Sequence, residues 1–188
     1  SVLVKNFNMW RQAEEDSYMD IDTWNAAQID PIDIDGQRVW FGIDVGKSSD
    51  LYAISWLIPQ EGYWYADSYA FVGTKYGLEA KIKADRLDYV RLQGMGQCEI
   101  TKLESGVIDV ERVYEWLDGF VREHNLDVQA ICYDPAQYGT LLTQIEKGHP
   151  EWQQISVRQG TLTLSMPTKQ FRDDILDKRV RHSDNEIL

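Results

Sequence analysis

Cysteine and histidine are scarce in this sequence, whose 188 residues include two cysteines and three histidines. Cys98 and Cys132 lie in separate segments without metal-ligand spacing, and two cysteines provide no disulfide framework. His124, His149 and His182 share no ligand spacing either, and we interpret each as a surface or helix-end residue. The sequence therefore contains no sign of a metal site built from cysteine or histidine.

Long apolar runs are absent as well. No stretch of about eighteen consecutive apolar residues occurs, and the N-terminus lacks a basic region followed by an apolar one. We therefore expect neither a membrane span nor a secretory signal, and we predict a soluble intracellular protein. The P-loop pattern G-x-x-x-x-G-K-[ST] is also missing, although Lys47-Ser48-Ser49 after Gly46 is compatible with a short phosphate-contacting turn.

Basic residues are outnumbered, since 19 lysines and arginines face 31 aspartates and glutamates and the formal net charge is −12. This balance argues against a protein that coats nucleic acid nonspecifically, because phosphate binding relies on Lys and Arg side chains that displace counterions. The charge is distributed unevenly. Residues 1–35 hold two basic and eight acidic side chains, whereas residues 158–182 hold six basic and three acidic ones.

The apolar content is sufficient for a folded domain, because 43% of the residues are hydrophobic and 12% are aromatic. Apolar patterning predicts strands over residues 39–43, 51–58, 63–72, 98–103, 128–133 and 155–157. Helical spacing and caps predict helices over residues 78–87, 109–124, 135–147 and 169–179, with a loop over 160–168. We interpret four aromatic residues as core rather than as a base-stacking platform: Trp40, Trp56, Trp64 and Trp116.

The first 36 residues differ in character from the rest. Residues 1–28 carry scattered apolar side chains among acids with broken helical periodicity, which indicates short helices that need a partner surface. Residues 30–36 form an acidic linker with turn residues. We therefore predict a connector over residues 1–36 and a separate domain over residues 37–188.

The predicted element order defines an α/β fold. Short connections make the first three strands of the domain an antiparallel meander, and a long helical crossover allows the strand at 128–133 to lie parallel beside the strand at 39–43. The result is a mixed sheet flanked by helices. Ligands of such open sheets bind beyond the carboxyl ends of the strands, where the strand order reverses.

Two aspartates follow the two strands that should meet there. Asp44 comes directly after the first strand and Asp134 directly after the strand at 128–133. We expect Asp44 to be poorly solvated and to need a partner. Converging carboxylates repel each other, and Mg²⁺ or Mn²⁺ removes that repulsion and prefers oxygen ligands. Two such ions about 3.5–4 Å apart generate a nucleophile and hold the leaving oxygen of a phosphodiester.

Structural roles compete with this interpretation. Asp134 before Pro135 is a good helix N-cap, and Asp50 before Leu51 is suited to a turn. An isolated aspartate at a strand end is more often structural, but two on neighbouring strands favour a site. We therefore assign Asp44 and Asp134 to the site and leave Asp50 as a structural residue.

The ordered motifs resemble those of a known family. They are Phe41-Gly42-Ile43-Asp44-Val45-Gly46 with Ser49-Asp50-Leu51, then Ile131-Cys132-Tyr133-Asp134-Pro135, then Gln159-Gly160 to Leu164-Ser165, and finally Val180 to Asn185. In order and spacing they resemble the nuclease domain of tailed-phage terminase large subunits. Residues 1–28 resemble the end of the preceding packaging ATPase domain and its connector.

The resemblance implies a ribonuclease H-like fold and an endonuclease that uses Mg²⁺ or Mn²⁺ to cut concatemeric viral DNA during packaging. Carried over by position, Asp44 and Asp134 are the catalytic metal ligands. The family's third acid lies on a helix beyond the 182–185 motif, and no residue up to Leu188 matches it. The resemblance therefore implies a C-terminally incomplete domain with an incomplete two-ion site.

The resemblance also implies partners and a location. The partners are double-stranded viral DNA, the terminase small subunit and the portal or procapsid, and the location is the host cell cytoplasm. The basic residues Lys169, Arg172 and Arg179 are either a solvated helix face or contacts to DNA phosphates. A local basic strip of this kind would reconcile DNA binding with the acidic net charge.

Two other classes remain open. An actin-like or sugar-kinase-type phosphotransferase domain shares the sheet topology and a strand-end Asp-x-Gly, but such proteins carry a second glycine-rich phosphate loop, which Asp134-Pro135-Ala136-Gln137-Tyr138 is not. A catalytically idle assembly module of a packaging motor is the other alternative. ATP binding would favour the first, and loss of partner binding after changes in residues 1–28 would favour the second.

Overall fold

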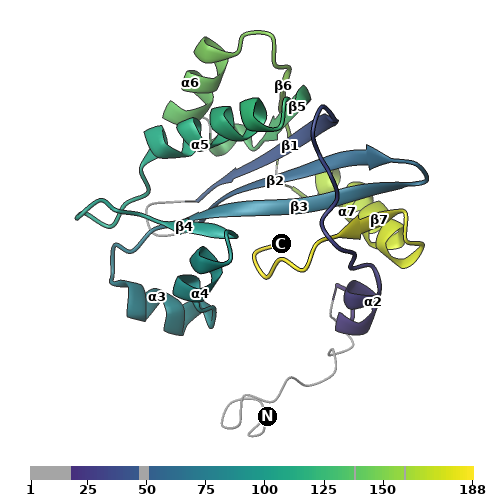
Figure 1. Cartoon of the computed structure of the whole chain (residues 1–188), viewed down its shortest axis with the longest axis horizontal. Helices are drawn as coiled ribbons and strands as arrows, with labels where there is room; N and C mark the ends of the chain where they lie inside the picture. Colours follow the sequence, from purple (N-terminus) through teal and green to yellow (C-terminus); the bar gives the residue numbers. More distant parts are fainter. Residues whose placement is uncertain (1–17, 47–50, 138, 159) are drawn as a thin grey trace, which may run out of the picture.

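A seven-stranded mixed sheet forms the centre of the protein in a computed structural model, which describes residues 18–46, 51–137, 139–158 and 160–188 (Figure 1). β1, β2 and β3 are antiparallel neighbours, β5 lies parallel to β1, and β6 lies parallel to β5. The order across the sheet is β4-β3-β2-β1-β5-β6, and β7 pairs with β3. The strands are β1 (Arg38–Val45), β2 (Leu51–Gln60), β3 (Tyr63–Val72), β4 (Cys98–Ile100), β5 (Asp127–Tyr133), β6 (Gln154–Ser156) and β7 (Val180–His182).

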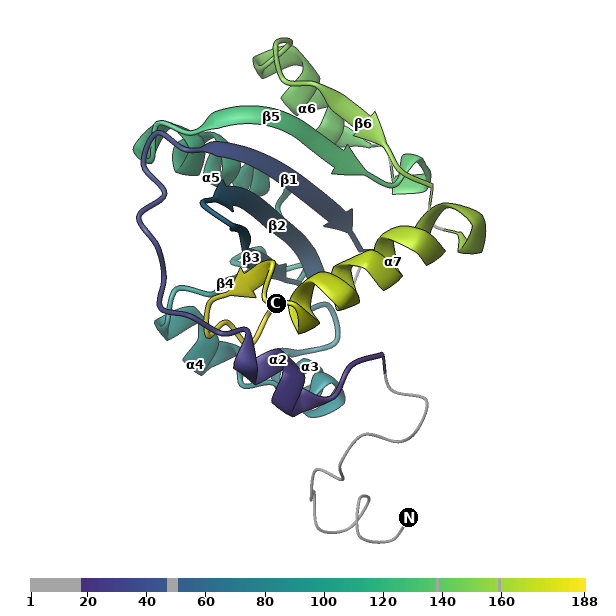
Figure 2. The ribbon, with the colours of Figure 1, turned by 90° about the vertical axis from the view of Figure 1, so that its right-hand side faces the viewer.

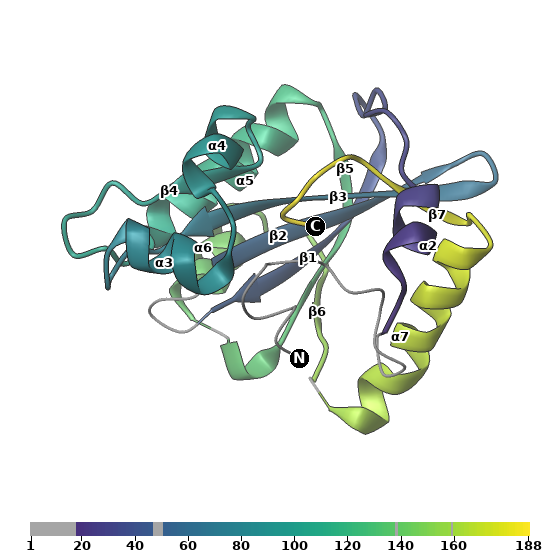
Figure 3. The ribbon, with the colours of Figure 1, turned by 90° about the horizontal axis from the view of Figure 1, so that it is seen from below.

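Helices cover both faces of this sheet. α5 and α6 lie on one face, and α2, α3, α4 and α7 lie on the opposite face (Figures 1 and 2). Seen from below, α3 and α4 cover one end of that second face while α2 and α7 cover the other (Figure 3). The helices are α2 (Ile21–Ala26), α3 (Leu78–Asp85), α4 (Tyr89–Gly94), α5 (Val110–Glu123), the 3₁₀-helix η1 (Pro135–Gln137), α6 (Thr140–Gly148) and α7 (Thr161–Leu176). The predicted α/β mixed sheet flanked by helices is confirmed.

The main core lies between β1 and α5. Every second residue of β1, namely Val39, Phe41 and Ile43, is buried beneath the helices, because successive side chains of a strand point to opposite faces. On α5 the buried residues are Val113, Leu117 and Val121, which recur at helical spacing. The first turn of α5 is capped by Asp109, whose carboxylate accepts hydrogen bonds from the backbone N–H groups of Glu111 at 3.1 Å and Arg112 at 3.4 Å.

The opposite face carries two smaller clusters. Tyr89 and Leu92 of α4 pack on the β3–β4 end of the sheet. At the other end Trp24 of α2 stacks on His182 of β7 with ring centroids 3.9 Å apart, and the backbone oxygen of Trp24 lies 2.9 Å from Nε2 of His182. α2 therefore packs against β7. The predicted boundary at residue 36 stays a prediction.

The outer edge of β3 has a gap that side chains close. β7 pairs with residues 64–66 of β3 and β4 pairs with residues 70–72, which leaves Ser68 between them. The backbone N–H of Ser68 donates to Asp67 Oδ1 at 2.8 Å, and its carbonyl accepts from Asn185 Nδ2 at 2.7 Å. Asn185 also donates to Asp67 at 2.7 Å. The backbone N–H and carbonyl of Ser68 are therefore satisfied without a neighbouring strand.

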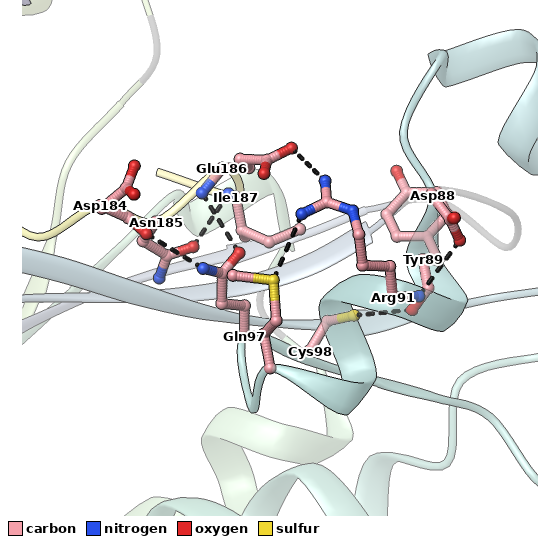
Figure 4. A network of polar contacts seen from close by, with 10 residues as sticks. Asp88, Tyr89, Arg91, Gln97, Cys98, Asp184, Asn185, Glu186 and Ile187 are labelled. Atoms are coloured by element: carbon pink, nitrogen blue, oxygen red, sulfur yellow. Dashed lines mark hydrogen bonds and ion pairs between the residues drawn. The ribbon is translucent and has the colours of Figure 1, made fainter. Parts of the chain in front are cut away.

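Gln97 and Arg91 hold the segment that carries Asn185 in place (Figure 4). Nε2 of Gln97 donates to the Asp184 carbonyl at 3.1 Å, and its Oε1 accepts from the Glu186 backbone N–H at 3.2 Å. Arg91 forms an ion pair with Glu186 at 2.6 Å, and the Arg91 guanidinium lowers the pKa of the Glu186 carboxyl. The chain after β7 is thus fixed against α4 and the start of β4.

Several expectations from the sequence are wrong. The predicted loop over residues 160–168 is helical, because α7 begins at Thr161 and continues through Pro167. The helix predicted from Pro135 is a short 3₁₀ turn followed by α6 from Thr140. His182 is 1% exposed rather than a surface residue. α4 and β7 were not predicted, since both are short and depend on tertiary contacts.

Candidate active site

Asp44 is the next-to-last residue of β1. The buried positions of β1 are Phe41 and Ile43, so the alternation of the strand directs Asp44 to the face opposite α5. Its register partner on β2 is Ala53, a small side chain that leaves space around the carboxylate. Asp44 is exposed. The expectation that it is poorly solvated is therefore wrong, because the bulky helix layer lies on the other face.

Asp134 follows the last residue of β5. β1 and β5 are parallel and pair Gly42 with Cys132 and Ile43 with Tyr133, so Asp44 and Asp134 are the next residues along two neighbouring strands. Asp134 is half-buried, and its Oδ1 accepts a hydrogen bond from the Ala136 backbone N–H at 3.0 Å. One carboxylate oxygen thus stabilises the turn into η1, which is the structural role that the sequence also suggested.

The strand register places the two carboxylates on one side of the sheet. Residues paired across neighbouring strands project to the same face, and Asp44 and Asp134 continue the register of Gly42 and Cys132. α7 runs past the carboxyl end of β1 on that side (Figure 2). Asp44 and Asp134 therefore meet at the strand-end position where open α/β sheets place their ligands.

The donor set suits a hard divalent cation. Both residues offer carboxylate oxygens, which Mg²⁺ and Mn²⁺ prefer, and Mg²⁺ keeps several water ligands when few protein ligands are present. Among the residues that the structure describes, no three His, Cys, Asp or Glu side chains form a group able to hold a metal ion. Two carboxylates therefore fit one cation that completes its coordination with water or substrate oxygens.

Neither cysteine suits this chemistry. Burial raises the pKa of the Cys98 thiol to about 11 and also raises the pKa of Cys132. Both thiols are therefore protonated at neutral pH, and a protonated thiol is neither a good nucleophile nor a good metal ligand. Oxygen ligands remain as the means of binding a metal at this edge.

The predicted DNA-binding residues lie on or next to α7 but differ in their surroundings. Arg179, just after α7, forms ion pairs with Asp174 at 2.7 Å and Asp177 at 2.8 Å. Arg172 lies 3.4 Å from Asp173. Lys169 is exposed and forms no ion pair within the described ranges. The positive charge of Arg179 is thus neutralised by neighbouring aspartates, whereas the charge of Lys169 is available to contact a phosphate.

A hollow of about 470 Å³ borders the first half of α7. Tyr18 closes one side by donating a hydrogen bond from its hydroxyl to the Thr168 carbonyl at 2.5 Å. The lining of the hollow includes Thr161, Ser165, Lys169 and Arg172. Sequence reasoning missed the contribution of Thr161 and Ser165, because it predicted a loop there. The signal that was available is the four-residue spacing of Thr161, Ser165 and Lys169, which places them on one side of a helix.

Some predicted features cannot be placed. Asp50 and the turn Lys47-Ser48-Ser49 lie outside the described residues. Among the tryptophans interpreted as core, Trp56 is 7% exposed and packs in the main core, but Trp64 is 38% exposed. Trp64 is therefore a surface residue, because it lies on β3 where only the short strand β7 covers the edge.

The fold and the placement of the two acids define the class of protein. A sheet with an antiparallel β1-β2-β3 meander, a parallel β5 beside β1, and acids at the carboxyl ends of β1 and β5 is that of a ribonuclease H-like protein. The chain belongs to the family described as "Terminase large subunit, endonuclease domain", whose model matches residues 1–188. It is thus an endonuclease domain of the phage terminase type.

Solved structures of two large terminases share this fold. The crystal structure of the HK97 bacteriophage large terminase matches with a TM-score of 0.75 and 19% identity, over 91% of this chain and 35% of that chain. The large terminase from a thermophilic bacteriophage matches with a TM-score of 0.55 and 12% identity, over 98% of this chain and 38% of that chain. No curated protein sequence matches the chain.

The matched terminases are considerably longer than this chain. The aligned region covers 35% of the HK97 protein and 38% of the protein from the thermophilic bacteriophage. At 19% and 12% identity, the likeness to these structures shows the fold alone. In the part of the chain that the structure describes, no helix has the length and apolar character needed to cross a membrane.

Proposed function

We propose that this chain is a metal-dependent DNA endonuclease domain that cuts concatemeric viral DNA during genome packaging. The observation that carries the proposal is the register of β1 and β5, which brings Asp44 and Asp134 to the same edge and face of the sheet. Family membership supports the nuclease activity. Metal dependence and the packaging role are the further steps of this proposal.

Asp44 and Asp134 would hold Mg²⁺ or Mn²⁺. When bound, such an ion lowers the pKa of a coordinated water and stabilises charge on a phosphodiester. The exposed carboxylate of Asp44 reaches solvent, so it is open to both an ion and DNA. Asp134 is held by its hydrogen bond to the Ala136 N–H, which fixes the orientation of its second oxygen. The predicted two-ion arrangement needs ligands beyond these two carboxylates and stays a prediction.

The first half of α7 would contact the DNA backbone. Lys169 and Arg172 supply positive charge, and Thr161 and Ser165 supply hydroxyl groups around the same hollow. Phosphate contacts of this kind position a duplex without reading its sequence. Because the chain carries a net charge of −12, we expect the isolated domain to bind DNA weakly. The packaging motor or procapsid would supply the remaining DNA contacts.

Removal of metal should abolish cleavage. We expect the chain to nick supercoiled plasmid with Mn²⁺ or Mg²⁺ and to fall to background in EDTA, with activity restored by excess Mn²⁺. Electrophoresis of the relaxed and linear products measures this. Nicking that persists in EDTA would contradict the proposal. Absence of nicking with either metal, in a chain that also fails to bind Mn²⁺ by calorimetry, would contradict it as well.

Neutralising the α7 cations should reduce the salt dependence of DNA binding. Each lost phosphate contact lowers the slope of log K against log[salt] by about 0.9. We expect this loss for Lys169→Gln and for Arg172→Gln, and a smaller one for Arg179→Gln, whose charge is already paired. Fluorescence anisotropy of a labelled duplex over a salt series measures the slope.

The matched control for this series is Arg122→Gln. Arg122 carries the same charge on α5, and its side chain is 75% exposed. It pairs with one aspartate, Asp118, at 3.0 Å, much as Arg172 lies 3.4 Å from Asp173. Arg122 lies on the helix that covers the opposite face of the sheet (Figure 1). An equal loss of slope for Arg122→Gln and Arg172→Gln would refute α7 as the DNA contact.

The remaining assignments follow from the proposed function. Residues 1–36 would connect the nuclease to a preceding packaging ATPase domain. The terminase small subunit and the portal or procapsid would be partners, and the host cell cytoplasm would be the location. The phosphotransferase and the idle-module readings have no observation of their own that favours them over the carboxylate pair.

A further inference from the structure

A groove of about 500 Å³ lies on the α5 side of the β3 edge, and none of its lining residues belongs to the candidate active site. It runs from the segment before β1, past the middle of β3, to the loop between α4 and β4 and the segment after β7. We call it the β3–α5 groove. Its lining includes Ile32, Trp56, Asp67, Trp116, Phe120 and Asp184.

Stacked aromatic rings form one wall. Tyr69 stacks on Trp116 with ring centroids 4.3 Å apart, and Trp116 stacks on Phe120 at 5.0 Å. Trp56 packs against Phe120 at 4.9 Å. Tyr69, Trp116 and Phe120 are half-buried. Burial raises the pKa of Tyr69 to about 12, so its phenol is neutral. Because the rings stack on one another, their faces are largely covered, and the wall presents apolar ring surface against which the aliphatic part of a long side chain can pack.

Carboxylates form the other wall. Asp67 is half-buried and accepts hydrogen bonds from Tyr65 Oη at 3.0 Å, the Ser68 N–H at 2.8 Å and Asn185 Nδ2 at 2.7 Å. All three donors are neutral. Asp184 is exposed, and only its backbone carbonyl takes part in the Gln97 contact. Asp67 and Asp184 thus contribute two negative charges that no described cation pairs.

The charge around the groove is one-sided. Its described lining contains no lysine or arginine, and its histidine, His124, lies 2.7 Å from Asp35. The nearby Arg91 is paired with Glu186, and Arg112 is paired with Glu99. DNA phosphates would face only like charge here, which is repulsive. A basic ligand would find both carboxylates and apolar ring surface.

We propose that the β3–α5 groove binds an arginine- or lysine-bearing segment of a partner protein. The charged end of the side chain pairs with Asp67 and Asp184, and its aliphatic stem packs along the Trp116 and Phe120 rings. The flanking apolar part of the segment contacts Ile32. The proposal is independent of the nuclease reaction, because the lining of the groove includes neither Asp44 nor Asp134.

The test uses two short peptides and the whole chain. One peptide is acetyl-Gly-Arg-Leu-Arg-Gly-amide, and the other replaces both arginines with glutamate. Binding is followed by the indole N–H signals of Trp56 and Trp116 in a ¹H–¹⁵N spectrum, assigned with Trp→Phe variants, and its strength by calorimetry. We expect the arginine peptide to shift both signals and the glutamate peptide to shift neither.

Variants then locate the site. We expect Asp184→Asn and Trp116→Leu each to weaken binding of the arginine peptide by about three- to fivefold, through loss of an ion pair and of apolar contact respectively. Asp173→Asn on α7 is the charge-matched control and should leave binding unchanged. Equal binding of both peptides, absence of arginine-peptide binding, or equal weakening by Asp173→Asn would overturn the proposal. Displacement of the peptide by duplex DNA, or self-association of the chain that Asp184→Asn abolishes, would assign the groove to another occupant and overturn it too.

Discussion

Asp44→Asn is expected to lower metal-dependent plasmid nicking by about 1,000-fold or more. A bound divalent ion contributes several kcal/mol to such a reaction, and each 1.4 kcal/mol corresponds to a factor of about ten in rate. Asparagine keeps the shape of the side chain but removes the charge that retains the ion. Because Asp44 is exposed at the end of β1, we expect the melting temperature to stay nearly unchanged.

Asp134→Asn should behave in the same way, because its amide oxygen still accepts the Ala136 N–H. The matched control is Asp127→Asn. Asp127 is the exposed first residue of the same strand, β5, at the end remote from Asp134, so the same chemical change there should leave nicking intact. Initial nicking rates at a fixed Mn²⁺ concentration measure all three variants. Wild-type rates for Asp44→Asn in a folded protein would refute the carboxylate site.

Leu117→Ala is expected to destabilise the domain by about 2–5 kcal/mol, which is the usual cost of removing a fully buried leucine side chain. Leu117 is 0% exposed in the layer between α5 and the sheet, where it packs with the β1 residues Phe41 and Ile43. The loss should appear as a lower urea midpoint and a lower melting temperature. Nicking at low temperature should persist, because Leu117 lies in the core on the face opposite Asp44.

Leu162→Ala provides the comparison, since the chemical change is identical. Leu162 lies in the first turn of α7 and is fully exposed, at 103% of the reference area. Surface substitutions of this kind change stability by about 0.5 kcal/mol or less. If the two variants lose equal stability, the described packing of α5 or of α7 is wrong.

Much of the sheet was predictable because its signals are local. The alternation of Val39, Phe41 and Ile43 identifies β1 and its buried face, and the apolar spacing after Asp109 identifies α5. The short turn at Glu61-Gly62 between β2 and β3 requires a left-handed residue, and Gly62 has a φ of 84°. Strand direction then follows from connection length, which is why the meander was predicted.

The errors arise where a segment depends on distant partners. α7 contains Thr161, Ser165 and Pro167, residues that usually indicate a loop, yet Ile175 and Phe171 anchor its second half in the cluster with Val180. β7 is only three residues long and exists because β3 offers an unpaired edge. Neither the anchoring of α7 nor the pairing of β7 can be read from the segment itself, so local propensity predicted the wrong secondary structure.

The candidate site also combines features set by local sequence with features set by distant contacts. Asp44 and Asp134 were identified from their positions after predicted strands, but their solvation was not, because it depends on which face the helices cover. The β3–α5 groove was not predicted at all, since the segments that form it contain Ile32, Asp67, Phe120 and Asp184, which are far apart in the chain.

The sequence by itself determined the strands, the main helices and the two acidic strand ends, because side-chain periodicity and turn residues act over a few neighbouring positions. Only the tertiary structure decided which faces are covered, that Arg179 is already paired, and that Asn185 closes the β3 edge against Asp67 across 118 residues. These features depend on contacts between distant segments, and such contacts form only once the whole sheet and its helix layers are assembled.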